Sequence, residues 1–210
     1  MSEADLAEVT IGGFLDALAA RVPAPGGGAT AALHAAQAAA LISMVARYTT
    51  GEKYADSADL ISGILEGAEA ERAAALQLAA DDAAAFTAVT DAYGLPRGTE
   101  SEKAHRTDAI AKALVGAAGP PADVIRTATS VMSLAEALLP VANRNVITDV
   151  AAASEAARAA ATTARLNVEV NLGGIRDEKV RAGLRRVLAR VDELTDRAAA
   201  VERSVRAVLA

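Results

Sequence analysis

Apolar residues recur three and four positions apart along most of this chain, which is the spacing of helices that bury one face. The pattern predicts helices over residues 11–21, 29–48, 56–93, 99–119, 122–139, 148–171 and 178–209. Prolines and paired glycines separate these segments, as expected of residues that end helices. Segment 29–48 is apolar nearly all round, so we expect it at the centre. The prediction is an all-α, single-domain elongated helical bundle with long helices, spanning residues 1–210.

Composition indicates how such helices would pack. Of the 210 residues, 52% are hydrophobic but only 2% are aromatic, and alanine alone makes up roughly a quarter of the chain. Alanine has the highest helix propensity and buries little area per residue, so we expect helices that approach closely through small side chains. Strand formers are scarce and cysteine is absent. These features exclude a β-sandwich, a disulfide-stapled module and a zinc-thiolate site.

Charge narrows the range of partners. The net charge is −6 and the pI is about 5.0, which leaves no broad positive field for duplex nucleic acid or an anionic membrane. The first residues, Met1 to Asp5, are acidic, unlike the basic leader of a signal peptide. Segment 29–46 carries His34 and Gln37, which favours a buried helix over a membrane span. We expect a cytoplasmic protein with a small-molecule substrate and neither a nucleic-acid nor a membrane partner.

Function is expected where the helical pattern is broken. The first break is formed by Pro25, Gly26, Gly27 and Gly28, directly before the central helix. Three glycines let the backbone approach a ligand closely, and a helix start directs free N–H groups at an anion. The alternative is a flexible turn between two helices. The loop lacks the Lys-Ser/Thr ending of a Walker loop.

The second break is Asp82, which falls on or beside the apolar stripe of segment 56–93. A carboxylate at such a position is partly desolvated, which raises its pKa and suits it to proton transfer. The alternative is a residue at the edge of the stripe that a neighbouring helix holds by hydrogen bonds. Asp82 is the first candidate catalytic residue.

The third break lies at the start of segment 148–171. Two amides, a hydroxyl and a carboxylate gather there, in Asn143, Asn145, Thr148 and Asp149. Helix capping explains Thr148 and, through the helix dipole, Asp149, but it does not explain all four. Asp149 is therefore the second candidate catalytic residue, and the other three are candidate substrate-binding residues, as are the residues of the glycine loop.

The fourth break lies at the end of the same segment, where Asn167 and Asn171 share one face and are further substrate-binding candidates. Asp149 projects along the same line, eighteen residues earlier, and eighteen helical residues span about 27 Å. One reacting centre cannot touch both ends within a subunit. Either an extended ligand lies along a shallow groove of alanines between them, or two subunits share a site.

Taken in order, these features resemble the cyclodeaminase domain of formiminotransferase-cyclodeaminase and the free-standing methenyltetrahydrofolate cyclohydrolases. The resemblance covers about residues 8 to 200. Each motif is short, but the ordered set is specific. The matching residues are Pro23-Ala24-Pro25-Gly26-Gly27-Gly28, Ala31-Ala32-Leu33, Met44-Val45, Gly51-Glu52-Lys53-Tyr54, Asp81-Asp82, Ala85-Phe86, Leu95-Pro96, Glu102-Lys103, Arg106, Asn143, Asn145, Thr148-Asp149-Val150, Asn167-Val168 and Val170-Asn171-Leu172.

The resemblance implies an all-helical homodimer that acts on a tetrahydrofolate derivative without a prosthetic group. One reaction of the family converts 5-formimidoyltetrahydrofolate to 5,10-methenyltetrahydrofolate and ammonia, and the other opens 5,10-methenyltetrahydrofolate to 10-formyltetrahydrofolate with water. Both need carboxylates and amides around one carbon. The chain departs from the family at Ala29 and Thr148, where Ser is frequent, and at Pro120-Pro121, where one proline is usual.

Several expectations about the site follow. The two histidines, His34 and His105, form no cluster, so we predict no metal. Because aromatic residues are scarce, we expect a pterin ring to be held by amides, backbone and aliphatic walls rather than by stacking. Residues 1–210 include no formiminotransferase segment, so we expect the cyclohydrolase slightly more than the cyclodeaminase, although a free-standing cyclodeaminase is equally compatible with the sequence. The alternative function is a catalytically inactive folate-binding or helical interaction protein.

Overall fold

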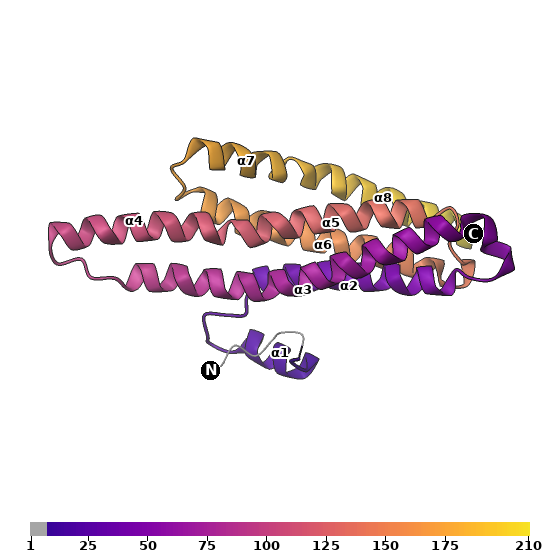
Figure 1. The fold of residues 1–210 in the computed structure, drawn as a ribbon, viewed down its shortest axis with the longest axis horizontal. Helices are drawn as coiled ribbons and strands as arrows, with labels where there is room; N and C mark the ends of the chain where they lie inside the picture. Colours follow the sequence, from indigo (N-terminus) through magenta and orange to yellow (C-terminus); the bar gives the residue numbers. More distant parts are fainter. Residues whose placement is uncertain (1–7) are drawn as a thin grey trace.

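The computed structural model describes residues 8–210, whose regular structure is entirely helical (Figure 1). Two short 3-10 helices, η1 (Glu52–Ser57) and η2 (Arg144–Val146), precede the third and sixth α-helices. The all-α prediction is confirmed, and the long helices lie roughly along one axis of an elongated bundle. The α-helices are α1 (Ile11–Ala19), α2 (Gly27–Tyr48), α3 (Ala58–Gly94), α4 (Glu100–Ala117), α5 (Gly119–Leu138), α6 (Ile147–Leu172), α7 (Glu178–Leu188) and α8 (Arg190–Leu209).

Helix α2 forms the core of the bundle, packed against α3, α5 and α6. Eight of its twelve buried residues are alanines, so the neighbouring helices can approach its backbone closely. Among the described residues it is the one helix long and apolar enough to cross a membrane, with a mean hydropathy of 1.5, yet 61% of that window is buried by the neighbours. The prediction of a central buried helix is therefore confirmed.

Helices α3 and α4 form a long hairpin whose tip extends beyond the rest of the bundle (Figure 1). A capping box begins α4: the Glu102 N–H donates to Thr99 Oγ1 at 3.2 Å, and the Thr99 N–H donates to Glu102 Oε2 at 2.8 Å. Pro120 and Pro121 then separate α4 from α5 as the sequence predicts, and they occupy the first turn of α5.

Three predicted helix boundaries need correction. Helix α2 begins at Gly27 and not at residue 29, so the last two glycines of the loop lie in its first turn. The segment expected as one helix over 178–209 is divided at Ala189 into α7 and α8, although its cap, Asp177, is the predicted one. Thr148 does not cap α6, because the helix already begins at Ile147 and places Thr148 inside its first turn. The capping residue here is Asn143, whose side-chain oxygen accepts the Asn145 N–H at the start of η2.

Candidate functional site

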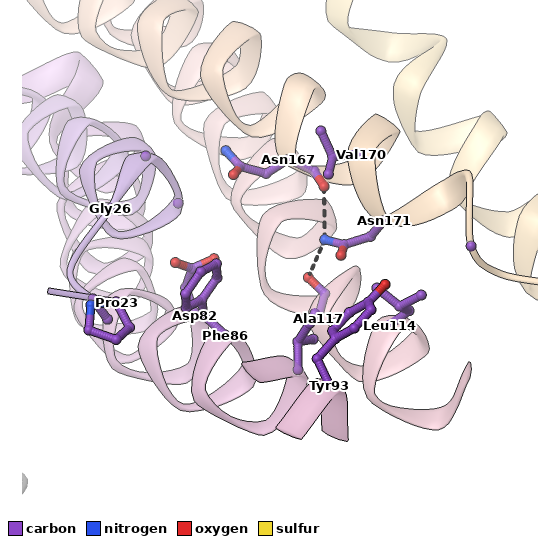
Figure 2. Close-up of a pocket in the computed structure, with 15 residues that line it drawn as sticks. Pro23, Gly26, Asp82, Phe86, Tyr93, Leu114, Ala117, Asn167, Val170 and Asn171 are labelled. Carbon is purple, nitrogen blue, oxygen red and sulfur yellow. Dashed lines mark hydrogen bonds between the residues drawn. The ribbon is translucent and has the colours of Figure 1, made fainter. Parts of the chain in front are cut away.

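A pocket of about 360 Å³ opens at the start of α2, between α3, α4 and α6 (Figure 2). Figure 2 shows Asp82 of α3 between the beginning of α2 and the last turns of α6. The structure therefore brings together three of the four sequence features that interrupt the helical pattern: the glycine loop, Asp82 and the asparagines at the end of α6. Pro25 itself does not line the pocket. The sequence-predicted residues that line it are Gly26, Gly27, Gly28, Asp82, Asn167 and Asn171.

Gly28 is needed because the Asp82 carboxylate lies directly against its backbone. A Cβ atom at Gly28 would stand 2.0 Å from Asp82 Oδ1 and 2.4 Å from Oδ2, closer than any real contact. Gly28 is buried in the first turn of α2, so the methyl group of an alanine would have to displace the carboxylate. Glycine is therefore required at position 28 because the Asp82 carboxylate approaches its backbone closely, and not because the chain must turn there.

Asp82 lies between two opposing electrostatic influences. Burial is the larger and raises the pKa of the Asp82 carboxyl above its ordinary value, while a hydrogen bond from the Ala29 backbone N–H lowers it. That N–H belongs to the first turn of α2, where the helix dipole also favours an anion. The carboxylate thus caps α2 from another helix, and the predicted partial desolvation is confirmed.

We expect Asp82→Asn to stabilise the fold at neutral pH. Because the folded-state pKa is raised above the unfolded value, this carboxyl contributes most to stability below the unfolded pKa, and the contribution is lost as pH rises through the folded pKa. Asparagine carries no charge to desolvate at any pH. Thermal unfolding from about pH 3 to pH 8 should show a gain in Tm that grows with pH. A gain that is greatest in acid would refute the assignment of a raised pKa.

The two asparagines are held by their amide nitrogens. Asn167 Nδ2 donates to the Thr163 carbonyl at 3.0 Å, and Asn171 Nδ2 donates to the carbonyls of Asn167 at 2.9 Å and Ala117 at 3.2 Å. The Ala117 carbonyl lacks its usual helical partner because Pro121 has no N–H. Within residues 8–210 no hydrogen bond reaches either Oδ1, so both amide oxygens can accept from a ligand.

An apolar wall completes the pocket. Phe86, Val89 and Tyr93 follow Asp82 by four, seven and eleven residues, so all four lie on one face of α3 and line the pocket. The pocket thus contains two of the five aromatic residues of the chain, and the expectation that amides, backbone and aliphatic walls hold a pterin ring stays a prediction. The helical spacing from Asp82 is the sequence signal that identifies this wall.

The residues at the start of α6 do not reach this pocket within the chain. Asn143 is committed to the fold: its Nδ2 donates to the Tyr48 carbonyl at 2.7 Å, its backbone N–H donates to Thr49 Oγ1 at 3.1 Å, and its Oδ1 caps η2. It therefore ties the end of α2 to the entry of α6, and its role in substrate binding stays a prediction. The other three predicted site residues at the start of α6 are accessible to a ligand or a partner, since Asp149 is half-buried and Asn145 and Thr148 are exposed.

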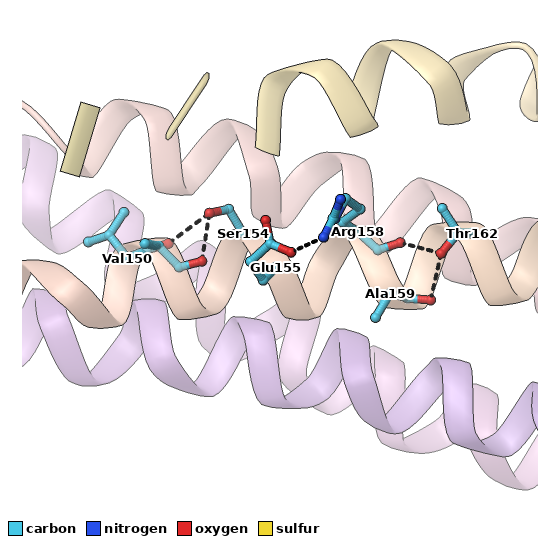
Figure 3. Close-up of polar contacts among 7 residues, drawn as sticks. Val150, Ser154, Glu155, Arg158, Ala159 and Thr162 are labelled. Carbon is cyan, nitrogen blue, oxygen red and sulfur yellow. Dashed lines mark hydrogen bonds and ion pairs between the residues drawn. The ribbon is translucent and has the colours of Figure 1, made fainter. Parts of the chain in front are cut away.

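The middle of α6 is not an open groove. Ala160, on the expected line of alanines, is fully buried, and α6 packs against α2, α5 and α8. The polar side chains here are satisfied within their own helix (Figure 3): the hydroxyls of Ser154 and Thr162 donate to carbonyls four residues earlier, at 3.1 and 2.9 Å, and Glu155 pairs with Arg158. The hypothesis of an extended ligand along α6 is therefore not supported, because small side chains here serve packing.

Known proteins resemble this chain over most of its length. The family model of formiminotransferase-cyclodeaminase matches residues 10–190. The chain is 43% identical over 169 residues to a methenyltetrahydrofolate cyclohydrolase from Methylorubrum extorquens, which covers 80% of this chain and 81% of that protein. It is 31% identical over 177 residues to the formimidoyltransferase-cyclodeaminase of Mus musculus, covering 84% of this chain but only 33% of that longer protein.

The fold is also that of a solved relative. The crystal structure of formiminotetrahydrofolate cyclodeaminase from Thermotoga maritima matches with a TM-score of 0.81 and 30% sequence identity, and the match covers 97% of both chains. Sequence and structure thus agree over nearly all of the described residues. The chain belongs to the formiminotransferase-cyclodeaminase family.

Proposed function

We propose that this protein opens 5,10-methenyltetrahydrofolate to 10-formyltetrahydrofolate by adding water. Family membership makes it a folate one-carbon enzyme, and the choice of reaction is the proposal. The relative that is 43% identical over most of both chains is a methenyltetrahydrofolate cyclohydrolase. The observation that carries the proposal is the pocket in which Asp82, a half-buried carboxyl with a raised pKa, lies against Gly28 of helix α2 and beside two amide acceptors.

The chemistry requires one group that first removes and then returns a proton. Water attacks the cationic methenyl carbon while the Asp82 carboxylate takes a proton from it, which gives a neutral carbinol. The protonated Asp82 then delivers that proton to N5 as the bond between N5 and the carbon breaks. The carbinol O–H becomes the formyl carbonyl and its proton passes to solvent, so one water is consumed and one proton released. The raised pKa of the Asp82 carboxyl suits both proton transfers, because a pKa nearer neutrality makes the carboxylate a better base and lets it hold the proton until N5 takes it.

The second candidate is cyclodeamination of 5-formimidoyltetrahydrofolate. It is favoured by the structural match to a formiminotetrahydrofolate cyclodeaminase. In that reaction N10 attacks the formimidoyl carbon, and the amino group must gain a proton before it leaves as ammonia. Asp82 would supply this proton, and the same pocket would hold the same tetrahydrofolate skeleton.

Two assays on one preparation decide between these reactions. Loss of the methenyl absorbance measures hydrolysis, and ammonia release from 5-formimidoyltetrahydrofolate measures deamination. Hydrolysis above the spontaneous rate is the expected result. Ammonia release without hydrolysis would transfer the assignment to the cyclodeaminase. Calorimetric binding of tetrahydrofolate with neither turnover would identify an inactive folate-binding protein.

We also propose that the protein is a homodimer in which the partner's Asp149 completes the pocket. Asp149 and the pocket lie at opposite ends of α6, and a two-fold axis across the middle of α6 would bring the start of one α6 beside the end of the other. Val170, which lines the pocket, is 79% exposed, and Leu166, one turn earlier on α6, is 61% exposed, which leaves apolar surface for a partner to cover.

A shared site predicts that two defective subunits restore each other. Asp82→Asn and Asp149→Asn should each lose about a hundredfold in rate as homodimers. A mixed dimer, isolated through two different affinity tags, should regain about half of the wild-type activity, because one of its two sites holds both carboxyls. The control pairs Asp82→Asn with the doubly substituted subunit and stays inactive. A mixed dimer no faster than its parents would rule out a site shared in this way.

A further inference from the structure

A cation that the proposed reaction leaves unused lies against Tyr93, the last aromatic residue of the pocket wall. Arg106 of α4 lies beside Tyr93, with its Cζ atom 5.6 Å from the centroid of the ring. Its Nε and Nη2 atoms donate to the Tyr93 carbonyl at 3.3 and 3.1 Å. These contacts hold the guanidinium next to the last aromatic residue of the pocket wall.

No carboxylate in residues 8–210 forms an ion pair with Arg106. Glu102 lies one turn earlier on α4, but its Oε2 accepts the Thr99 N–H of the capping box. The Tyr93 carbonyl uses only two of the guanidinium N–H groups, and an arginine offers about five. Arg106 is thus fixed in place yet keeps donors for an anionic ligand.

The spacing along α3 separates this cation from Asp82. Asp82 and Tyr93 are eleven residues apart, which corresponds to about 16 Å along the helix axis. Phe86 and Val89 line the pocket between them. Along α3 the pocket therefore presents a carboxyl and then an apolar and aromatic wall, and the guanidinium of Arg106 lies beside the far end of that wall.

We propose that Arg106 binds the glutamate carboxylates of the folate substrate and so sets the direction in which the substrate lies. The proposal rests on the proposed function. A folate carries a pterin with its one-carbon unit, then a benzoyl ring, then glutamate carboxylates, which is the order of complementary groups along this pocket. The planar fork of arginine matches a carboxylate with two parallel hydrogen bonds. In a chain of net charge −6, an unpaired cation at this point gives the anionic tail a local partner.

The test compares 5,10-methenyltetrahydrofolate with 5,10-methenyltetrahydropteroate, which lacks the glutamate. Arg106→Gln should raise KM for the folate about ten- to hundredfold, the effect of losing hydrogen bonds between charged groups. Its kcat should change little, because the contact is equal in ground and transition states. KM for the pteroate should stay the same. Arg106→Lys keeps the charge without the fork and should give an intermediate KM for the folate.

The matched control is Lys112→Gln, which removes a positive charge from the same helix. Lys112 lines a separate hollow together with Asp81 and Asp91, so both KM values should stay at the wild-type level. Equal increases in KM for folate and pteroate in Arg106→Gln would overturn the proposal, because they would mean that Arg106 acts only by supporting Tyr93.

Binding measurements separate this proposal from the proposed function. If the wild-type protein turns over neither methenyl compound, the proposed reaction fails. Calorimetry with tetrahydrofolate and tetrahydropteroate would then still decide the role of Arg106. Tighter binding of tetrahydrofolate that is lost in Arg106→Gln supports a carboxylate site. Equal binding of the two compounds by the wild-type protein, or binding of neither, overturns it.

Discussion

Asp82→Asn is expected to slow the hydrolysis of 5,10-methenyltetrahydrofolate by at least about a hundredfold, the typical contribution of a positioned acid–base group. The amide keeps the shape of the carboxyl but can neither take a proton from water nor deliver one to N5. The loss should fall on kcat rather than KM, because the proton moves only during the chemical steps. Initial rates over a range of substrate concentrations, measured by the methenyl absorbance, give both constants.

Asp81→Asn is the matched control for this substitution. Asp81 precedes Asp82 on the same helix, but it is exposed, accepts a hydrogen bond from Gln77 at 2.9 Å and does not line the pocket. Its removal should leave kcat near the wild-type value. If Asp82→Asn kept wild-type kcat, or if both variants lost activity equally, Asp82 would have no role as an acid or base.

Gly28→Ala is expected to reduce kcat nearly as much as Asp82→Asn. The new methyl group would stand 2.0 Å from Asp82 Oδ1, so the carboxylate must move away from the α2 N-terminus and lose the Ala29 N–H. The backbone itself can accommodate alanine, since Gly28 lies within a regular helix. Steady-state kinetics combined with thermal unfolding would separate a displaced carboxylate from a failure to fold.

Gly63→Ala provides the comparison for a glycine-to-alanine change in a helix. Gly63 lies in α3, and no atom stands within 4 Å of the Cβ that alanine would add. This variant should keep full activity and gain slightly in stability, since alanine is favoured over glycine in helices by about 1 kcal/mol. Wild-type kcat in folded Gly28→Ala would disprove the tight fit between Gly28 and Asp82 as a requirement for catalysis.

The sequence predicts most of the fold because helix signals are local. The apolar period, the Thr99–Glu102 capping box and the pair Pro120-Pro121 act within a few residues, and each has the predicted effect. The break at Ala189 is missed, since the apolar pattern continues across it. The cap assigned to Thr148 is wrong because it depends on where one turn of η2 ends.

The candidate site is predictable only in part, because its key contacts join distant segments. The stripe position of Asp82 indicates a desolvated carboxyl, but its fit against Gly28 requires the packing of α2 on α3. The role of Asn143 depends on the Tyr48 carbonyl, 95 residues earlier in the chain. The rise of a helix is enough to predict from the sequence that Asp149 and Asn167 lie far apart. Only the structure shows that alanines between them are buried, and this burial argues against a groove along α6.

The proposed hydrolysis is tested most simply by the rate at which purified protein removes the absorbance of 5,10-methenyltetrahydrofolate. The wild-type protein and Asp81→Asn should both exceed the spontaneous rate, and Asp82→Asn should fall toward it. This result would place a folate hydrolysis in the pocket between α2, α3 and α6. A wild-type rate equal to the spontaneous one would contradict the proposed hydrolysis. An Asp82→Asn rate equal to that of the wild type would contradict the role of Asp82 in it.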